Sequence, residues 1–262
     1  VVGEDLHMYL DAELQVAAYN ALGDFRGAVV AIEPETGGIL AMVSKPGYNP
    51  NTFVTGFSET EFEEIKNSVS KPFFNRAAEG QYAPGSTFKP VVGLGAISFG
   101  LMDWDTIIDD KGTFSLPGGD RVYRDWAWTP KNPGGQGRVD LRRAIYRSSN
   151  IYFYDVASRM DIGRLASFTE QFGYGKKLIS DFPSVVTGLV PNEEWKLKVR
   201  GEKWYQGDTV NLGIGQGDLL VTPVQVAYLA ATIANRGELV DLKMVRSIPI
   251  SASIDAEEYS RT

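Results

Sequence analysis

Ser86 and Lys89 lie three positions apart, directly before the apolar run 91–97. In a helix, residues i and i+3 share one face, so these two side chains would lie within reach of each other. A serine hydroxyl is a weak nucleophile that needs a base, and a lysine supplies one if burial lowers its pKa. The alternative is a helix-capping serine beside a solvated lysine. Because an apolar helix follows, we expect Lys89 to be drawn inside, which favours the pairing of a serine nucleophile with a lysine base.

A second polar group, Ser148-Ser149-Asn150, interrupts the apolar helical spacing of residues 140–160. Three adjacent small polar residues weaken a helix, so they predict a break at this point. A loop that brings Ser148 and Asn150 to one side could pass a proton and hold a substrate amide. The other interpretation is a helix break with local caps and no chemical role.

A glycine-rich run and a group of aromatic residues could each serve in binding, but each also has a purely structural explanation. The glycine-rich run 213–217 lacks the Gly-Lys-Ser/Thr ending of a phosphate-binding loop, and no βαβ pattern surrounds it. It therefore predicts a turn that needs a flexible backbone rather than a nucleotide site. The aromatic residues Tyr123, Trp126 and Trp128 could stack on a sugar or a peptide, or pack beneath a loop.

The composition narrows the chemistry further. The 262 residues include 26 Lys and Arg against 33 Asp and Glu, a formal net charge of −7, which argues against a nucleic-acid partner. The sequence has no cysteine, which excludes disulfides, thiolate metal ligands and cysteine nucleophiles. Its one histidine, His7, allows a Ser-His-Asp triad only if His7 itself serves.

These residues must be positioned by a fold with both helices and strands. The apolar runs 28–32 and 39–43 flank a glycine-containing turn and predict a β-hairpin with both faces covered. The stretch 103–137, rich in Gly, Pro and Trp, predicts an irregular insertion or short hairpins. Such a mixture, with helices segregated around a sheet, indicates an α+β domain. Helices are predicted over 11–22, 59–67, from Ser86 onward, 140–160 with its break, 164–172, and 222–235 with Thr222 as N-cap.

Several longer sequence motifs follow one another between residue 10 and about residue 237, in an order and at a spacing that are characteristic when taken together. They are Leu-Asp-Ala-Glu-Leu-Gln at 10–15, Thr-Gly-Gly-Ile-Leu-Ala-Met-Val-Ser at 36–44, Asn-Arg-Ala at 75–77, Pro-Gly-Ser-Thr-Phe-Lys-Pro at 84–90, Tyr-Arg-Asp-Trp at 123–126, Ser-Ser-Asn at 148–150, Trp-Tyr-Gln-Gly-Asp-Thr at 204–209, Gly-Ile-Gly-Gln-Gly at 213–217 and Thr-Pro at 222–223. Together they resemble the transpeptidase domain of class B penicillin-binding proteins, most closely the branch that serves cell elongation. The resemblance implies an α+β fold like that of penicillin-binding proteins and serine β-lactamases, with an antiparallel sheet flanked by helices.

The resemblance also implies a role for each motif residue. Ser86 would be the acyl-accepting nucleophile, and Lys89 the general base that activates it. Ser148 would relay a proton, and Asn150 would contact the substrate. The backbone N–H of Ser86 would supply one half of an oxyanion hole.

By the same resemblance, the substrate would be a peptidoglycan stem peptide ending in D-Ala-D-Ala, and β-lactams would acylate the same serine. The partners would be membrane proteins of the elongation machinery, including a glycosyltransferase, with no nucleic acid among them. The chain begins at Val1 without a signal pattern. We therefore expect an anchor upstream that holds the protein at the periplasmic face of the bacterial inner membrane.

Two departures from the family pattern accompany the resemblance. The third motif of the family, Lys-Ser/Thr-Gly, does not occur in the sequence. We therefore expect residues 1–262 to be one partial transpeptidase domain that lacks the C-terminal strand carrying this motif, and the fragment alone could be inactive. Some relatives hold zinc through Asp, His and Cys near residues 123–137. Here Asp109 and Asp125 could match, but Gln136 stands in place of the His and there is no Cys, so we predict no metal and no cofactor.

Two other functions compete with the transpeptidase interpretation. A D,D-carboxypeptidase or serine β-lactamase would use the same serine with water as the acceptor, but the stretch 204–217 fits small hydrolases poorly. A non-catalytic module that only binds cell-wall peptide would explain the lack of the third motif. Acylation by penicillin, and the rate at which the acyl group is released, would separate the three.

Overall fold

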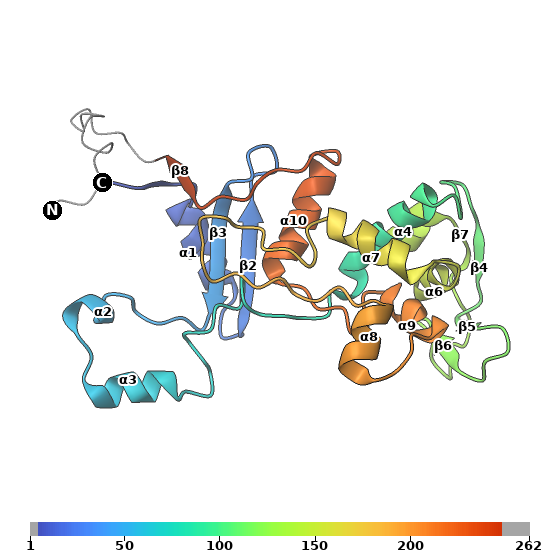
Figure 1. Ribbon diagram of the computed structural model, residues 1–262, viewed down its shortest axis with the longest axis horizontal. Coiled ribbons are helices and arrows are strands. Elements are labelled where there is room, and N and C mark those ends of the chain that lie inside the picture. Colours follow the sequence, from blue (N-terminus) through green and yellow to red (C-terminus); the bar gives the residue numbers. More distant parts are fainter. Residues whose placement is uncertain (1–4, 248–262) are drawn as a thin grey trace. The chain divides into compact units, whose positions relative to one another are not determined.

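The computed structural model describes residues 5–247, which form parts of two compact units (Figure 1). Unit 1 comprises residues 1–79, 177–185 and 227–262, and unit 2 comprises residues 80–176 and 186–226. Within the described part of the chain, no helix is both long and apolar enough to cross a membrane. The expectations about the two chain ends, at Val1 and Thr262, lie outside the described residues.

The central element of unit 1 is the antiparallel hairpin of β2 (Gly27–Ile32) and β3 (Ile39–Lys45). The turn between them brings Gly37 to a φ of 75°, and a Cβ there would overlap the backbone oxygen of Asp241, so only glycine fits. The hairpin prediction is confirmed, but the expectation of two fully covered faces is wrong. Alternate residues of β3 are buried, whereas every residue of β2 is half-buried, so one face is covered better than the other.

Helix α1 (Ala12–Ala21) packs against β3 in the same unit. Asp11 caps this helix by accepting the N–H of Leu14. The side-chain amide of Gln15 bonds both the N–H and the carbonyl of Met42, at 2.9 and 3.0 Å. A single polar side chain thus ties the helix to the sheet.

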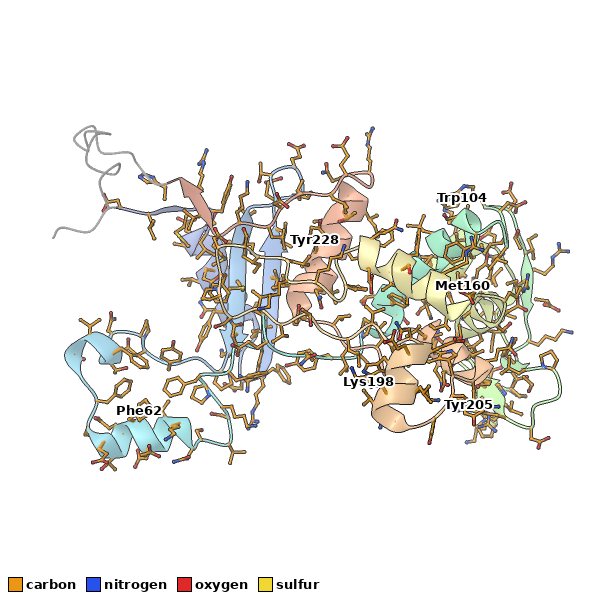
Figure 2. All side chains as sticks on the ribbon, in the orientation of Figure 1. Phe62, Trp104, Met160, Lys198, Tyr205 and Tyr228 are labelled. Carbon is orange, nitrogen blue, oxygen red and sulfur yellow. The ribbon has the colours of Figure 1, made fainter. Side chains whose placement is uncertain are left out.

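The remaining elements of unit 1 are shorter. Strands β1 (His7–Met8) and β8 (Val245–Ser247) form an antiparallel pair. Helices α2 (Thr52–Thr55) and α3 (Glu59–Lys66) follow the hairpin, and a capping box of Ser58 and Glu61 starts α3. An aromatic group lies beside them, in which Phe62 contacts Phe57 and Phe73 (Figure 2).

Unit 2 is mainly helical. A 3₁₀ turn, η1 (Gly85–Phe88), leads directly into α4 (Lys89–Ser98), so the predicted helix start near Ser86 is confirmed. Two glycines let neighbouring residues approach α4 closely, since a Cβ on Gly93 would meet Leu141 at 2.8 Å and one on Gly95 would meet Phe168 at 3.2 Å. The other helices are α5 (Leu141–Tyr146), α6 (Asn150–Ser158), α7 (Ile162–Gln171), α8 (Glu193–Arg200) and α9 (Gln206–Leu212).

The stretch 103–137, predicted to be an irregular insertion or short hairpins, contains one short hairpin enclosed by a second antiparallel strand pair. Strand β4 (Ile108–Asp110) pairs with β7 (Gly137–Val139), and β5 (Thr113–Ser115) pairs with β6 (Val122–Arg124). Both β4 and β5 contact α6. The insertion therefore lies against the helix that follows the Ser148-Ser149-Asn150 motif.

The last helix, α10 (Pro223–Ala234), begins within the residues of unit 2 and continues into those of unit 1. The predicted cap is present: Thr222 Oγ1 accepts the N–H of Gln225, and Gln225 Oε1 accepts the N–H of Thr222. The amide nitrogen of the same buried glutamine donates to the carbonyls of Gly173, Lys176 and Thr187. One side chain thus satisfies a buried group of loop carbonyls in unit 2.

Candidate active site

Ser86 is exposed at the first turn of η1, where backbone N–H groups have no partner within the helix. The preceding Gly85 has a φ of 57°, which glycine adopts without strain. Its N–H donates to the carbonyl of Gly215 at 2.9 Å, and a Cβ on Gly215 would overlap the carbonyl of Gly85. The prediction of a turn at 213–217 is confirmed, and the structure places this turn against Gly85, the residue before Ser86.

Lys89 lies at the start of α4 with only 1% of its surface exposed, so it is drawn inside as predicted. Its Nζ donates to Ser148 O at 2.8 Å, Ser148 Oγ at 3.0 Å and Asn150 Oδ1 at 2.8 Å. These contacts use all three donors of an ammonium group. The structure has no hydrogen bond between Lys89 and Ser86, although the i, i+3 spacing put them within reach.

Ser148 connects the two residues instead. It lies between α5 and α6 with a φ of 54°, a left-handed conformation that is rare outside glycine. Its Oγ donates to Ser86 Oγ at 2.8 Å while accepting from Lys89 Nζ. Ser149 Oγ caps α6 by accepting the N–H of Tyr152, so the predicted helix break with a local cap is confirmed. The proton transfer through Ser148 stays a prediction.

Burial lowers the pKa of Lys89 to about 8, and the negative charge of Asp125 limits this fall. A protein interior disfavours the charged amine, which explains the direction of the shift. A pKa near neutrality suits a general base, because a useful fraction is unprotonated while the base stays strong enough to take a proton.

The hydroxyl of Ser86 opens into a cavity of about 400 Å³. The wall includes Trp126, whose exposed indole donates its N–H to the carbonyl of Arg147 at 3.2 Å. Of the three aromatic residues singled out in the sequence, Trp126 therefore lies at the site, whereas Tyr123 is buried in an aromatic cluster with Tyr154. The complete lining is Gly85, Ser86, Trp126, Ser148, Asn150, Ile214 and Gln216.

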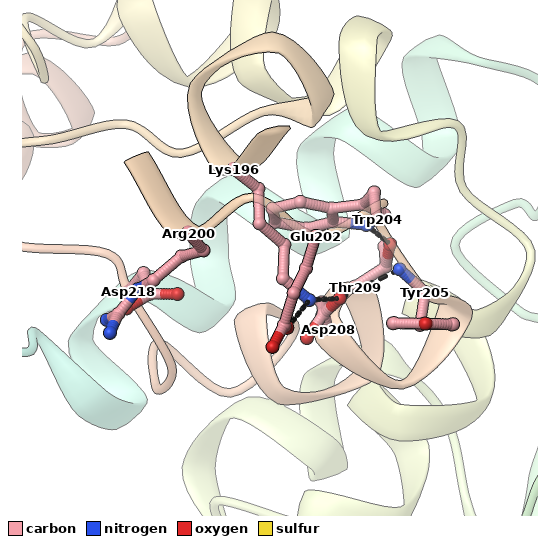
Figure 3. Close-up of polar contacts among 8 residues, drawn as sticks. All are labelled: Lys196, Arg200, Glu202, Trp204, Tyr205, Asp208, Thr209 and Asp218. Carbon is pink, nitrogen blue, oxygen red and sulfur yellow. Dashed lines mark hydrogen bonds and ion pairs between the residues drawn. The ribbon is translucent and has the colours of Figure 1, made fainter. Parts of the chain in front are cut away.

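The Trp-Tyr-Gln-Gly-Asp-Thr stretch at 204–209 is held by polar contacts with α8 and within itself (Figure 3). The carboxylate of Asp208 accepts the N–H of Tyr205 at 2.8 Å and pairs with Lys196 Nζ at 2.6 Å. The indole of Trp204 donates to Thr209 Oγ1 at 2.8 Å. These contacts fix the start of α9, which packs on α6 and leads into the 213–217 turn. Helices α8 and α9 were not predicted from the sequence.

The donor set does not fit zinc. Asp109 is exposed and its nearest ionic partner is Lys111, at 3.8 Å. Asp125 is buried, but its Oδ1 accepts the side-chain N–H of Gln136 at 3.2 Å, so the amide faces the carboxylate as a donor. Within residues 5–247, no three His, Cys, Asp or Glu side chains are placed to share a metal ion.

Sequence reasoning missed Asp110, which is buried directly behind the 148–150 motif while Asp109 points to solvent. Adjacent residues of a strand face opposite sides, so the pair Asp109-Asp110 implied that one would point inward. Nothing in the local pattern says which one. Gln216, in the cavity wall, was noted only as part of the glycine-rich run.

Residues 27–260 match the family model described as "Penicillin binding protein transpeptidase domain", a match that spans residues of both units. The chain is 43% identical over 245 residues to peptidoglycan D,D-transpeptidase MrdA of Acinetobacter baumannii, covering 94% of this chain and 36% of that protein. It therefore spans about a third of the length of this curated relative.

Two solved structures have the same fold. Pseudomonas aeruginosa PBP2 in complex with WCK 5153 is 42% identical, with a TM-score of 0.89, over 97% of this chain and 57% of that one. Helicobacter pylori PBP2 in complex with MreC is 31% identical, with a TM-score of 0.86, over 97% of this chain and 46% of that one. The expected α+β fold and the likeness to the elongation branch are thereby confirmed, and the chain belongs to the penicillin-binding protein transpeptidase family.

Proposed function

We propose that this chain carries the acylation site of a peptidoglycan D,D-transpeptidase that crosslinks stem peptides in cell-wall elongation. The observation that carries the proposal is the continuous hydrogen-bonded path from Ser86 Oγ through Ser148 Oγ to the buried Nζ of Lys89. A nucleophile and a relay that line one cavity are then joined to a buried base with a lowered pKa. The family match and the name of the Acinetobacter baumannii relative support the same reaction.

A proton can move from Ser86 to Lys89 only when Lys89 is neutral, because a protonated amine has no lone pair to accept it. With neutral Lys89, two N–H groups serve Ser148 O and Asn150 Oδ1, and the lone pair faces Ser148 Oγ. Ser86 then gives its proton to Ser148, which passes its own proton to Lys89. Asn150 holds the amine in the orientation that this transfer requires.

In the acylation step, Ser86 Oγ bonds to the carbonyl carbon of the penultimate D-Ala. The amide bond to the terminal D-Ala breaks, and the proton taken from Ser86 leaves on the amine of that residue. An amine of a neighbouring stem peptide then attacks the ester, forms the crosslink and returns a proton to Ser86 Oγ. A β-lactam would react in the same first step: Ser86 Oγ attacks the carbonyl carbon of the strained ring amide, the ring C–N bond breaks, and the opened drug stays bound to Ser86 as an ester.

For the whole protein, we propose one transpeptidase domain that includes residues 1–262 and works at the periplasmic face of the inner membrane. An N-terminal anchor and partners of the elongation machinery, including a glycosyltransferase, would belong to that assembly. The Helicobacter pylori relative in complex with MreC supports a partner of this kind.

The test is labelling of the full-length protein with a fluorescent penicillin, with Ser86→Ala as the matched variant. We expect stable labelling of the wild type, none of Ser86→Ala, and D-Ala release with crosslinking when stem peptides are supplied. Rapid loss of the label with release of hydrolysed penicillin would favour the carboxypeptidase or β-lactamase alternative. A folded wild-type protein that takes no label would favour the non-catalytic binding module.

A further inference from the structure

The turn that bears Ser148 and Asn150 needs support from outside itself. Ser148 is held at a φ of 54°, and its carbonyl and hydroxyl oxygens both accept from Lys89. A non-glycine residue in this conformation persists only where its surroundings hold it there. The Lys89 contacts are one restraint, but they lie on the side that must exchange a proton.

Asp110, at the end of β4, supplies a second restraint from the interior. Only 1% of its surface is exposed. Its Oδ1 accepts the N–H of Gly112 at 2.8 Å, and its Oδ2 accepts the hydroxyl of Ser149 at 2.7 Å. Because Ser149 Oγ also accepts the N–H of Tyr152, the carboxylate fixes the side chain that starts α6.

Asp125, which follows β6, supplies a third restraint on the backbone. It is 3% exposed, and its Oδ2 accepts the N–H of Asn150 at 2.7 Å. Its Oδ1 accepts from the N–H of Ala127 at 3.0 Å and from Gln136 Nε2 at 3.2 Å, so the carboxylate is itself held in place. A negative charge at the first turn of α6 also interacts favourably with the helix dipole.

Neither carboxylate has a hydrogen bond to Ser86 or Lys89, so a positioning effect must pass through the turn. Against the lowering by burial, the charge of Asp125 also raises the pKa of Lys89 directly, and acylation measured above pH 8, where Lys89 is mostly neutral, separates that effect from positioning. Ser149 lies between Ser148 and Asn150, and its side chain points away from the cavity toward Asp110. The two acceptors of Lys89 thus stand on either side of the residue that Asp110 holds. A displacement of this turn would lengthen the contacts from Lys89 to both neighbours.

We propose that Asp110 and Asp125 are positioning residues that hold the Ser148-Ser149-Asn150 turn in the geometry of the proton path. The proposal rests on the proposed function, because the proton path is the one assigned to acylation. Two buried carboxylates perform this task by accepting hydrogen bonds from Ser149 and Asn150, beside a Gln136 amide that faces Asp125 as a donor and not as a metal ligand.

The test uses Asp110→Ala and Asp125→Ala in the full-length protein, with the neighbouring exposed Asp109→Ala as the matched control. Penicillin acylation is resolved into the dissociation constant of the first complex and the rate constant of acylation at saturation. We expect the acylation rate constant of both variants to fall about 10–100-fold, with the dissociation constant nearly unchanged, because misplaced groups mainly cost rate. Wild-type rate constants in folded variants would overturn the proposal.

Asp110→Asn is the conservative variant. Its amide can accept from Gly112 and donate to Ser149 Oγ, so we expect most of the lost rate to return. If Asp110→Ala does not fold, Ser149→Ala removes the same contact from the other side and should slow acylation by a similar factor. A folded Ser149→Ala variant with the wild-type rate constant would contradict positioning through Ser149.

Amide hydrogen exchange keeps this proposal separate from the proposed function. The N–H of Asn150 donates to Asp125, so Asp125→Ala should speed exchange in a peptide covering residues 147–153, while Asp109→Ala should not. If the wild type takes no penicillin, the proposed function fails, and exchange still decides whether Asp125 holds the turn. Unchanged protection in both Asp110→Ala and Asp125→Ala would overturn the positioning role.

Discussion

Ser148 donates a hydrogen bond of 2.8 Å from its hydroxyl to the hydroxyl of Ser86. The same oxygen accepts from Lys89 Nζ at 3.0 Å, so the nucleophile and the base communicate through a residue 62 positions away from Ser86. Under the proposed function, this contact gives the second serine a part in acylation, and it leads to predictions for each residue along the path.

Lys89→Ala should lower the acylation rate by about 10²–10⁴-fold, because no other base reaches Ser148 Oγ in the described site. The rate is measured with a fluorescent penicillin, alongside thermal unfolding to establish that the variant folds. Lys66→Ala, which removes an exposed lysine from α3, is the control. A Lys89→Ala variant that acylates at the wild-type rate would remove this residue from the role of base.

The acylation rate should depend on pH through the pKa of Lys89, which burial lowers to about 8. The base must be unprotonated, so the rate should rise about tenfold per pH unit below 8 and level off above it. At pH 7 about one-tenth of the protein would carry a neutral lysine. Stopped-flow acylation between pH 6 and 10, corrected for spontaneous hydrolysis, gives the profile. A flat profile across pH 8 would argue against a lysine base.

Ser148→Ala and Ser148→Gly should both lose the relay hydroxyl but differ in stability. The φ of 54° strains any residue with a Cβ, so the glycine variant should be about 1 kcal/mol more stable than the alanine variant. Urea unfolding measures this difference, and penicillin labelling measures the shared loss of rate. Equal stabilities would show that the left-handed conformation carries no cost here.

Gly215→Ala should destabilise the turn beside Ser86 and slow acylation. An added Cβ would overlap the carbonyl of Gly85, on top of the strain at a φ of 69°. Gly217→Ala is the matched control, with a φ of 87° but its nearest neighbour, Asn211 Cβ, at 3.8 Å. We expect the control to lose about 1 kcal/mol and Gly215→Ala clearly more. Similar losses in chemical unfolding would mean that the contact with Gly85 is not limiting.

Lys196→Met should destabilise the protein more than Arg200→Met, although both residues lie in α8 and pair with an aspartate. Lys196 is buried, and its Nζ lies 2.6 Å from the carboxylate of Asp208. The hydrogen bond that Lys196 donates to Asp208 raises the pKa of the lysine. Arg200 and its partner Asp218 are more exposed, and such a pair contributes less than about 1 kcal/mol. Urea unfolding of both variants compares them, and the reverse order would contradict the assigned role.

Much of the site was predictable because its signals are local. The helix start at Ser86, the break at residues 148–150 and the turn at 213–217 all follow from short-range backbone preferences. The order of motifs indicated the family before any contact was visible. The absence of cysteine, with His7 as the one histidine, also excluded a cysteine nucleophile and made a histidine base improbable, which favoured Lys89 as the proposed base.

Only the tertiary structure decided which partners these residues have. Lys89 contacts Ser148 and Asn150, 59 and 61 positions along the chain, rather than the serine three positions before it. Likewise Asp110, and not Asp109, is the buried carboxylate behind the turn. The spacing of residues along one helix or strand shows which side chains share a face. The residues that this face contacts belong to segments far away in the sequence, and a local sequence pattern does not predict how those segments pack.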